Sequence, residues 1–190
     1  MSVPSWVAAI VLFLQLPIPL YWFVVHPFRA FWRGHPRGVY LAGLGCSWLP
    51  VTIAIVAFHR QLFRSTWPPL SLLIAGLLLI LLEVWIFWRV SHDLGFARLV
   101  GQKELEGVGE IESRGIYSRI RHPRYTASFL AIIGACLLAG TRISWMVALL
   151  WLMLMTVVIA MEEREMRARF GPKYLSYCSE TPRFLPKLRP

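Results

Sequence analysis

RGIYSRIRHPRY, residues 114–125, is a basic stretch that separates the third and fourth apolar runs of the chain. Proline is favoured at the first position of a helix, where its missing N–H would have no intrahelical partner anyway. The stretch therefore predicts a helix that begins at Pro123, with His122 as its cap. Free backbone N–H groups at that helix start predict an anion site facing the cytosol. The alternative is a basic collar that binds lipid phosphates.

Apolar runs on both sides of this stretch indicate a polytopic membrane protein. The chain is 57% hydrophobic, with a mean hydropathy of +0.57, whereas soluble domains are typically below about half apolar. Five runs predict transmembrane helices, at residues 4–25, 38–58, 70–90, 123–140 and 143–161. Pro17 and Pro19 should bend the first of them. We expect an all-α fold in one domain, residues 1–190, with three helices in residues 1–90 and the functional part in residues 91–190.

The fourth and fifth runs are joined by the short turn Gly140-Thr141-Arg142 and should form a helical hairpin. The fifth run ends at a pair of carboxylates, Glu162–Glu163, and Gly171–Pro172 should end the amphipathic helix that follows. A hairpin brings its two free ends together. We therefore expect the carboxylate pair to lie close to the turn at residues 121–123, in a pocket on the cytosolic side.

Basic residues are distributed unevenly, and this predicts the orientation in the membrane. On one side of the predicted membrane, residues 26–37, 89–124 and 164–190 carry 3, 7 and 7 Lys and Arg residues. The other side carries three, in residues 59–69 and 140–142. Cytoplasmic segments are enriched in Lys and Arg, so we expect the N-terminus outside and the C-terminus in the cytosol of a bacterial or archaeal cell. This topology explains the net charge of +10 without a nucleic-acid partner.

Glu83 is a carboxylate inside the third apolar run. Ionisable residues within a membrane are costly and are usually functional, which makes Glu83 a candidate catalytic residue. An ion pair with Arg89, near the end of the same helix, is the alternative.

The three cysteines, Cys46, Cys136 and Cys178, form neither a CxxC motif nor a Cys/His metal spacing. We therefore expect no disulfide framework and no bound metal.

The predicted pocket combines a basic helix start, two carboxylates and several tyrosines, and this combination suggests a ligand. A ligand carboxylate would favour the helix start and Arg121. A glutamate can accept hydrogen bonds from a ribose or an amine, and tyrosine rings can stabilise a cation. S-adenosylmethionine carries a carboxylate, an ammonium group, a ribose and a sulfonium, and is the cofactor we expect.

Two motifs carry a resemblance to a known family. GIYSRIRHPRY at residues 115–125 and EEREMRARFGPKYLSY at residues 162–177 are similar to the two motifs of the isoprenylcysteine carboxyl methyltransferase and phospholipid methyltransferase superfamily. The resemblance covers roughly residues 102–186. It implies an integral-membrane enzyme that uses S-adenosylmethionine. The cofactor-binding candidates are Gln102, Tyr117, His122, Pro123, Arg124, Tyr125, Glu162 and Glu163, with residues 109–112 also at matching spacings.

Arg121, His122 and Glu83 are the candidate catalytic residues, and Glu83, Glu163 and His122 are the candidates for a general base. The sequence departs from the family pattern at Val158, where enzymes that methylate isoprenylcysteine have a basic residue four positions before the first glutamate.

The resemblance therefore suggests a lipophilic acceptor that enters from the bilayer, with membrane lipids as neighbours, rather than a prenylated carboxylate. Phospholipid N-methylation and isoprenylcysteine-type carboxyl methylation are alternatives. A non-catalytic lipid-binding subunit or transporter is an alternative from another class.

Overall fold

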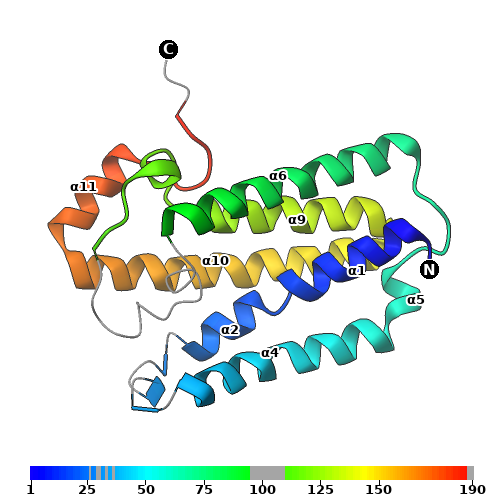
Figure 1. Cartoon of the computed structure of the whole chain (residues 1–190), viewed down its shortest axis with the longest axis horizontal. Helices are drawn as coiled ribbons and strands as arrows, with labels where there is room; N and C mark the ends of the chain where they lie inside the picture. Colours follow the sequence, from blue (N-terminus) through cyan, green and yellow to red (C-terminus); the bar gives the residue numbers. More distant parts are fainter. Residues whose placement is uncertain (26, 29–30, 33, 36, 95–109, 188–190) are drawn as a thin grey trace.

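Helices form most of the chain. The structure is a computed structural model that describes residues 1–25, 27–28, 31–32, 34–35, 37–94 and 110–187, and these residues include no β-strand. The helices are α1 (Val3–Gln15), α2 (Ile18–Val25), α4 (Arg37–Ala57), α5 (His59–Leu62), α6 (Leu70–Leu94), α9 (Pro123–Ala139), α10 (Arg142–Phe170) and α11 (Pro172–Glu180), with a short 3-10 helix, η1 (Gly115–Ser118) (Figure 1). The all-α expectation is confirmed.

The first apolar run is divided into α1 and α2, as its prolines predict. Pro19 has no N–H to donate to the Gln15 carbonyl four residues earlier. The indole Nε1 of Trp151 on α10 donates to that carbonyl oxygen instead, at 2.9 Å. The bend therefore ties the first run to α10, because a buried carbonyl needs a partner.

Helix α9 lies at the centre of the bundle, packed closely against α6 and α1 (Figure 1). Two glycines permit the close approach of α6 and α9. A methyl group added at Gly76 would lie 3.0 Å from the Gly134 carbonyl oxygen, and one added at Gly134 would lie 2.8 Å from the Gly76 oxygen. Small residues let helix backbones approach closely in a membrane. This packing fixes the position at which α9 begins.

The predicted hairpin is formed by α9 and α10. Helix α9 begins at Pro123 after the cap residue His122, and Gly140, at φ 66°, ends it in the left-handed conformation. The side chain of Thr141 then caps α10 by accepting a hydrogen bond from the Ser144 N–H at 3.1 Å. These features confirm the predicted boundaries of the turn.

Helix α10 runs without a break for 29 residues to Phe170, and Gly171 is its C-cap. Its length is about 43 Å, which exceeds the roughly 30 Å hydrocarbon core of a bilayer. In the predicted topology, its apolar part at residues 143–161 spans the membrane. Its charged part at residues 162–170 therefore lies beyond the membrane-spanning segment, where α11 packs against it.

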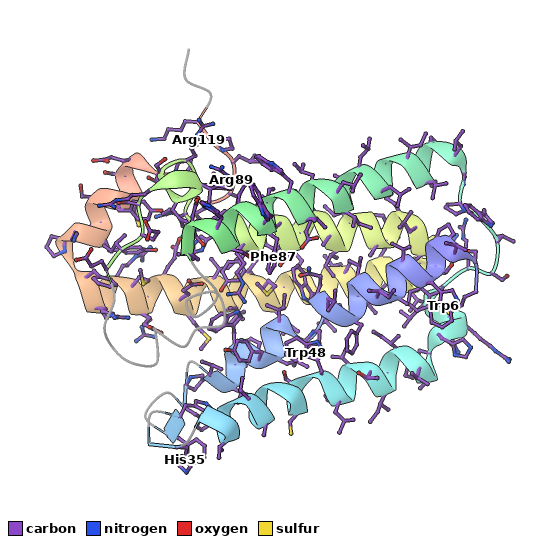
Figure 2. All side chains as sticks on the ribbon, viewed as in Figure 1. Trp6, His35, Trp48, Phe87, Arg89 and Arg119 are labelled. Carbon is purple, nitrogen blue, oxygen red and sulfur yellow. The ribbon has the colours of Figure 1, made fainter. Side chains whose placement is uncertain are left out.

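Among the described residues, three helical segments are long and apolar enough to cross a membrane: Val3–Val25, Leu70–Leu94 and Arg142–Phe170. The shorter apolar helices are Leu41–Ala57 and Pro123–Ala139. Most of α6 is exposed, and its exposed residues are predominantly large and apolar. Such a surface is expected of a helix that contacts lipid. Figure 2 shows the labelled Arg89 and Arg119 at one end of the bundle and Trp6 at the other.

Candidate functional site

The polar elements of the molecule meet at one end of the bundle. The start of α9, the charged end of α10, η1 and α11 lie together there, and the C-terminal strap, residues 181–184, joins them (Figure 1). The strap enters the site through backbone hydrogen bonds. The Arg121 N–H donates to the Pro182 carbonyl at 2.8 Å, and the His122 N–H donates to the Arg183 carbonyl at 3.0 Å. These two donors at the predicted anion site are therefore already engaged.

Glu163 is the electrostatic centre of this end and is only 2% exposed. In the part of the chain that the structure describes, four basic side chains contact its carboxylate. His122 Nε2 lies 3.1 Å from Oε1, and Arg121 Nη2 lies 3.4 Å from the same oxygen. Arg183 makes contacts of 3.0 Å to Oε1 and 2.6 Å to Oε2, and Arg167 lies 3.3 Å from Oε2. The carboxylate thus joins the start of α9 to both α10 and the strap.

These contacts determine the ionisation of Glu163. Burial raises the pKa of a carboxyl group, because it penalises the charged form. Hydrogen bonds from His122 and Arg183, together with the charges of Arg121 and His122, outweigh burial and lower the pKa of Glu163 to about 2. Glu163 is therefore an anion at neutral pH. Both of its oxygens are engaged within the protein, and its role as a cofactor-binding residue remains a prediction.

The preceding residue, Glu162, has different surroundings. It is half-buried, and its Oε2 accepts a hydrogen bond from the Tyr125 hydroxyl at 2.6 Å. Glu162 enters no ion pair with any residue that the structure describes. A carboxylate with one neutral donor retains the capacity to accept further hydrogen bonds. Glu162 is therefore the acidic residue of this site that is suited to a ligand.

Arg121 is the cation best placed to bind an anion. Its side chain is 9% exposed, and its contact with Glu163 is the longest of the four in that cluster. Its Nε atom is buried and has no hydrogen-bond partner among the described residues. Buried donors normally have a partner, and a bound water, ion or ligand group is one way to supply it.

A tyrosine on α11 fixes η1 beside this cluster. The Tyr177 hydroxyl donates to the Tyr117 carbonyl at 2.7 Å, and burial raises the pKa of Tyr177 further above neutral pH. At the other end of η1, Asp93 of α6 accepts a hydrogen bond from the Ile116 N–H at 3.0 Å. Neither contact follows from the sequence motifs, but together they hold Tyr117 near the start of α9.

The remaining candidates lie in several places. Pro123 is buried at the helix start, and the Arg124 guanidinium lies over the Trp22 ring, 5.2 Å from its centroid. Residues 110–112 line an open hollow of about 400 Å³ together with Lys173 and Tyr177. Gln102 and residue 109 lie outside the described residues.

Glu83 is not part of the Glu163 cluster. It accepts a hydrogen bond from the Gln15 side chain on α1 at 3.4 Å, which is a different contact from the expected pair with Arg89. Asp93 lies ten positions after Glu83 on helix α6, which corresponds to about 15 Å along the axis. Glu83 therefore lies deeper in the bundle than η1, and its catalytic role remains a prediction.

Among the residues that the structure describes, no group of three or more His, Cys, Asp or Glu side chains is placed to hold a metal ion. The expected absence of a metal remains a prediction.

Comparisons with known proteins identify similar sequences. A family model described as phospholipid methyltransferase matches residues 71–173. The nickel-cobalt-cadmium resistance protein NccN of Alcaligenes xylosoxydans xylosoxydans is 29% identical over 140 residues, covering 73% of this chain and 60% of that protein. The cobalt-zinc-cadmium resistance protein CzcN of Cupriavidus metallidurans is 27% identical over 138 residues, covering 72% and 59%. The chain thus spans about three fifths of the length of these relatives.

Proposed function

The chain belongs to the phospholipid methyltransferase family, and we propose that it is an integral-membrane enzyme that transfers a methyl group from S-adenosylmethionine to a lipophilic acceptor. The observation that carries this proposal is the meeting of Arg121 and Glu162 at one end of the bundle. There, the family-matched segment presents a buried unpaired donor and a carboxylate with free acceptor capacity.

The residues at this end fit the proposed cofactor. Arg121 would bind its carboxylate through the buried Nε, while Glu162 would accept hydrogen bonds from its ribose or amine. Tyr117 and Tyr125 would lie alongside them. When bound, the cofactor supplies an electrophilic methyl group on a sulfonium. The protein's contribution is to orient this group toward the acceptor and to exclude water, since in-line alignment dominates such a transfer.

We propose five membrane spans, with the N-terminus outside and the C-terminus in the cytosol of a bacterial cell. The support is the set of apolar helices, the basic end of the bundle and the bacterial source of both relatives. Cysteines introduced one at a time at Lys187 and at Arg64 test this topology. The first should react with a membrane-impermeant reagent only from the cytosol, and the second only from outside. Labelling of both from one side would exclude five spans.

The acceptor that we propose is an amine, a hydroxyl or a thiol on an apolar tail. Val158, at the position where the isoprenylcysteine enzymes have a basic residue, is 1% exposed and belongs to the apolar core. A carboxylate at a membrane edge needs a fixed cation, because its desolvation is costly. Phospholipid N-methylation agrees with this reasoning better than carboxyl methylation. The exposed apolar surface of α6 would allow such an acceptor to approach from the bilayer.

Two measurements on the full chain in detergent test the function. Calorimetry should detect binding of S-adenosylhomocysteine, the demethylated form of the cofactor. A membrane lipid extract incubated with the protein and methyl-labelled cofactor should acquire label, and a farnesylated N-acetylcysteine should not. If neither binding nor transfer is observed, a lipid-binding subunit or transporter becomes the better description.

A further inference from the structure

The C-terminal strap lies beyond residues 71–173, the part of the chain that the family model matches, yet it contacts the centre of the site. We propose that Arg183 of this strap is a positioning residue for methyl transfer. Its guanidinium holds Glu163 in one orientation, and Glu163 in turn holds the turn of Arg121 and His122 in the geometry that binds the cofactor. The functional part of this inference rests on the function proposed above.

The side chain of Arg183 donates hydrogen bonds to both oxygens of the Glu163 carboxylate. Its Nε lies 3.0 Å from Oε1, and its Nη2 lies 2.6 Å from Oε2. A two-pronged contact of this kind fixes the plane of a carboxylate, which a single contact leaves free to rotate. Oε1 is also the oxygen that faces His122 Nε2 at 3.1 Å. Arg183 therefore sets the direction of the hydrogen bond that orients the imidazole.

The backbone of the strap acts on the same turn. The carbonyl of Arg183 accepts the His122 N–H, and the preceding carbonyl accepts the Arg121 N–H. The Phe184 ring then packs against the His122 ring, with centroids 5.9 Å apart. His122 is consequently held through its backbone, its ring face and its Nε2 atom. All three contacts depend directly or indirectly on the strap.

Arg167 provides a matched control within the same cluster. Its side chain is 52% exposed, as is that of Arg183, and both contact Oε2 of Glu163. Arg167 makes a single contact of 3.3 Å from the next turn of α10, and it does not belong to the strap. Removing either cation leaves Glu163 with three basic partners among the described residues. A difference in Kd between the two variants would therefore reflect where the lost cation lies, and not how many cations remain.

The experiment compares the variants Arg183→Met, Arg183→Lys and Arg167→Met with the parent protein, all as the full chain in detergent. Calorimetry gives the Kd for S-adenosylhomocysteine, and thermal unfolding gives the midpoint. Nitrogen NMR of histidine-labelled protein gives the resonances of His122, assigned with His122→Gln. The histidine signal is the readout that a general loss of stability would not produce in a folded protein.

We expect Arg183→Met to raise the Kd at least about tenfold and to shift the His122 resonances, while Arg167→Met raises it less than about threefold. Arg183→Lys keeps the positive charge but loses the two-pronged contact with the carboxylate. Its Kd should therefore lie between those of the other two variants. If Arg183→Met does not fold, the test uses Arg183→Lys instead. That variant should then show the intermediate Kd and shifted His122 resonances. Equal Kd values for the Arg183 and Arg167 variants, or an unshifted His122, would overturn the positioning role. Absence of binding by the parent protein would instead contradict the proposed function, while the His122 shift would still test the positioning contact.

Discussion

Glu162 and Glu163 are neighbours on one helix, but they lie in opposite environments. A step of one residue turns an α-helix by about 100°, so adjacent side chains face different surroundings. Glu163 faces the start of α9 and the strap, which supply three basic partners, and Arg167 of α10 supplies a fourth. Glu162 faces the hydroxyl of Tyr125 and remains half-buried. Both oxygens of Glu163 are thus engaged within the protein, whereas Glu162 keeps the capacity to accept further hydrogen bonds.

The largest effect should follow the loss of the Glu163 charge. In Glu163→Gln, the buried His122 and Arg121 side chains lose their counter-charge, which costs about 3–5 kcal/mol for a buried pair. We expect a large drop in the thermal unfolding midpoint in detergent and a loss of S-adenosylhomocysteine binding. Glu165→Gln, two residues further along the same helix, is the control, and it should change the midpoint and the binding little. An unaltered midpoint in Glu163→Gln would mean that the cluster does not support the fold.

Glu162→Gln should separate binding from stability. A hydrogen bond that involves a charge contributes about 1.5–3 kcal/mol, which corresponds to about 10-fold to 150-fold in Kd. We expect this loss of S-adenosylhomocysteine affinity with little change in the unfolding midpoint, again with Glu165→Gln as the control. If Glu162→Gln lowers the midpoint as far as Glu163→Gln does, the two carboxylates share one role and the comparison fails.

Much of this site could be predicted from the sequence, because local rules specify it. The proline after His122 fixed the expected helix start, and Gly140 with Thr141 fixed the turn of the hairpin. A hairpin then places residues 162–163 beside the helix start whatever the details of packing. The positions of the main site candidates therefore followed from local chemistry and one topological argument.

The roles of the two glutamates could not be predicted in the same way. Which of two adjacent carboxylates faces the bundle depends on the rotation of α10 about its axis, and that rotation is set by packing along the whole helix. Arg183 was missed because the strap has no regular secondary structure, so no periodicity indicates its partner. Its signal was chemical: a buried carboxylate requires compensating charge, and Arg183 follows a proline near the end of the chain.

The charge of Glu163 should also make the stability of the protein depend on pH. The pKa of Glu163 is lowered from 4.5 to about 2 in the folded protein. Its contribution to stability is therefore complete above pH 4.5 and is lost as the pH falls toward 2. The difference in unfolding midpoint between the parent and Glu163→Gln should be constant at neutral pH and shrink below about pH 4.5. A difference in midpoint that grows as the pH falls through this range would contradict the lowered pKa of Glu163.

The smallest predicted effect concerns the hydroxyl of Tyr125, which donates to Glu162 at 2.6 Å. Tyr125→Phe removes that donor but keeps the ring, which is stacked on His122 with centroids 5.5 Å apart, so the fold should persist. Without the hydroxyl, Glu162 loses the contact that orients it, and S-adenosylhomocysteine should bind about fivefold more weakly, corresponding to about 1 kcal/mol.

The variant that combines Tyr125→Phe with Glu162→Gln tests whether the hydroxyl acts through Glu162. If the hydroxyl acts only through the carboxylate, the double variant should bind no more weakly than Glu162→Gln alone, because the effects of residues in contact are not additive. Fully additive losses would mean that Tyr125 contacts the ligand independently, and that Glu162 is oriented by something else.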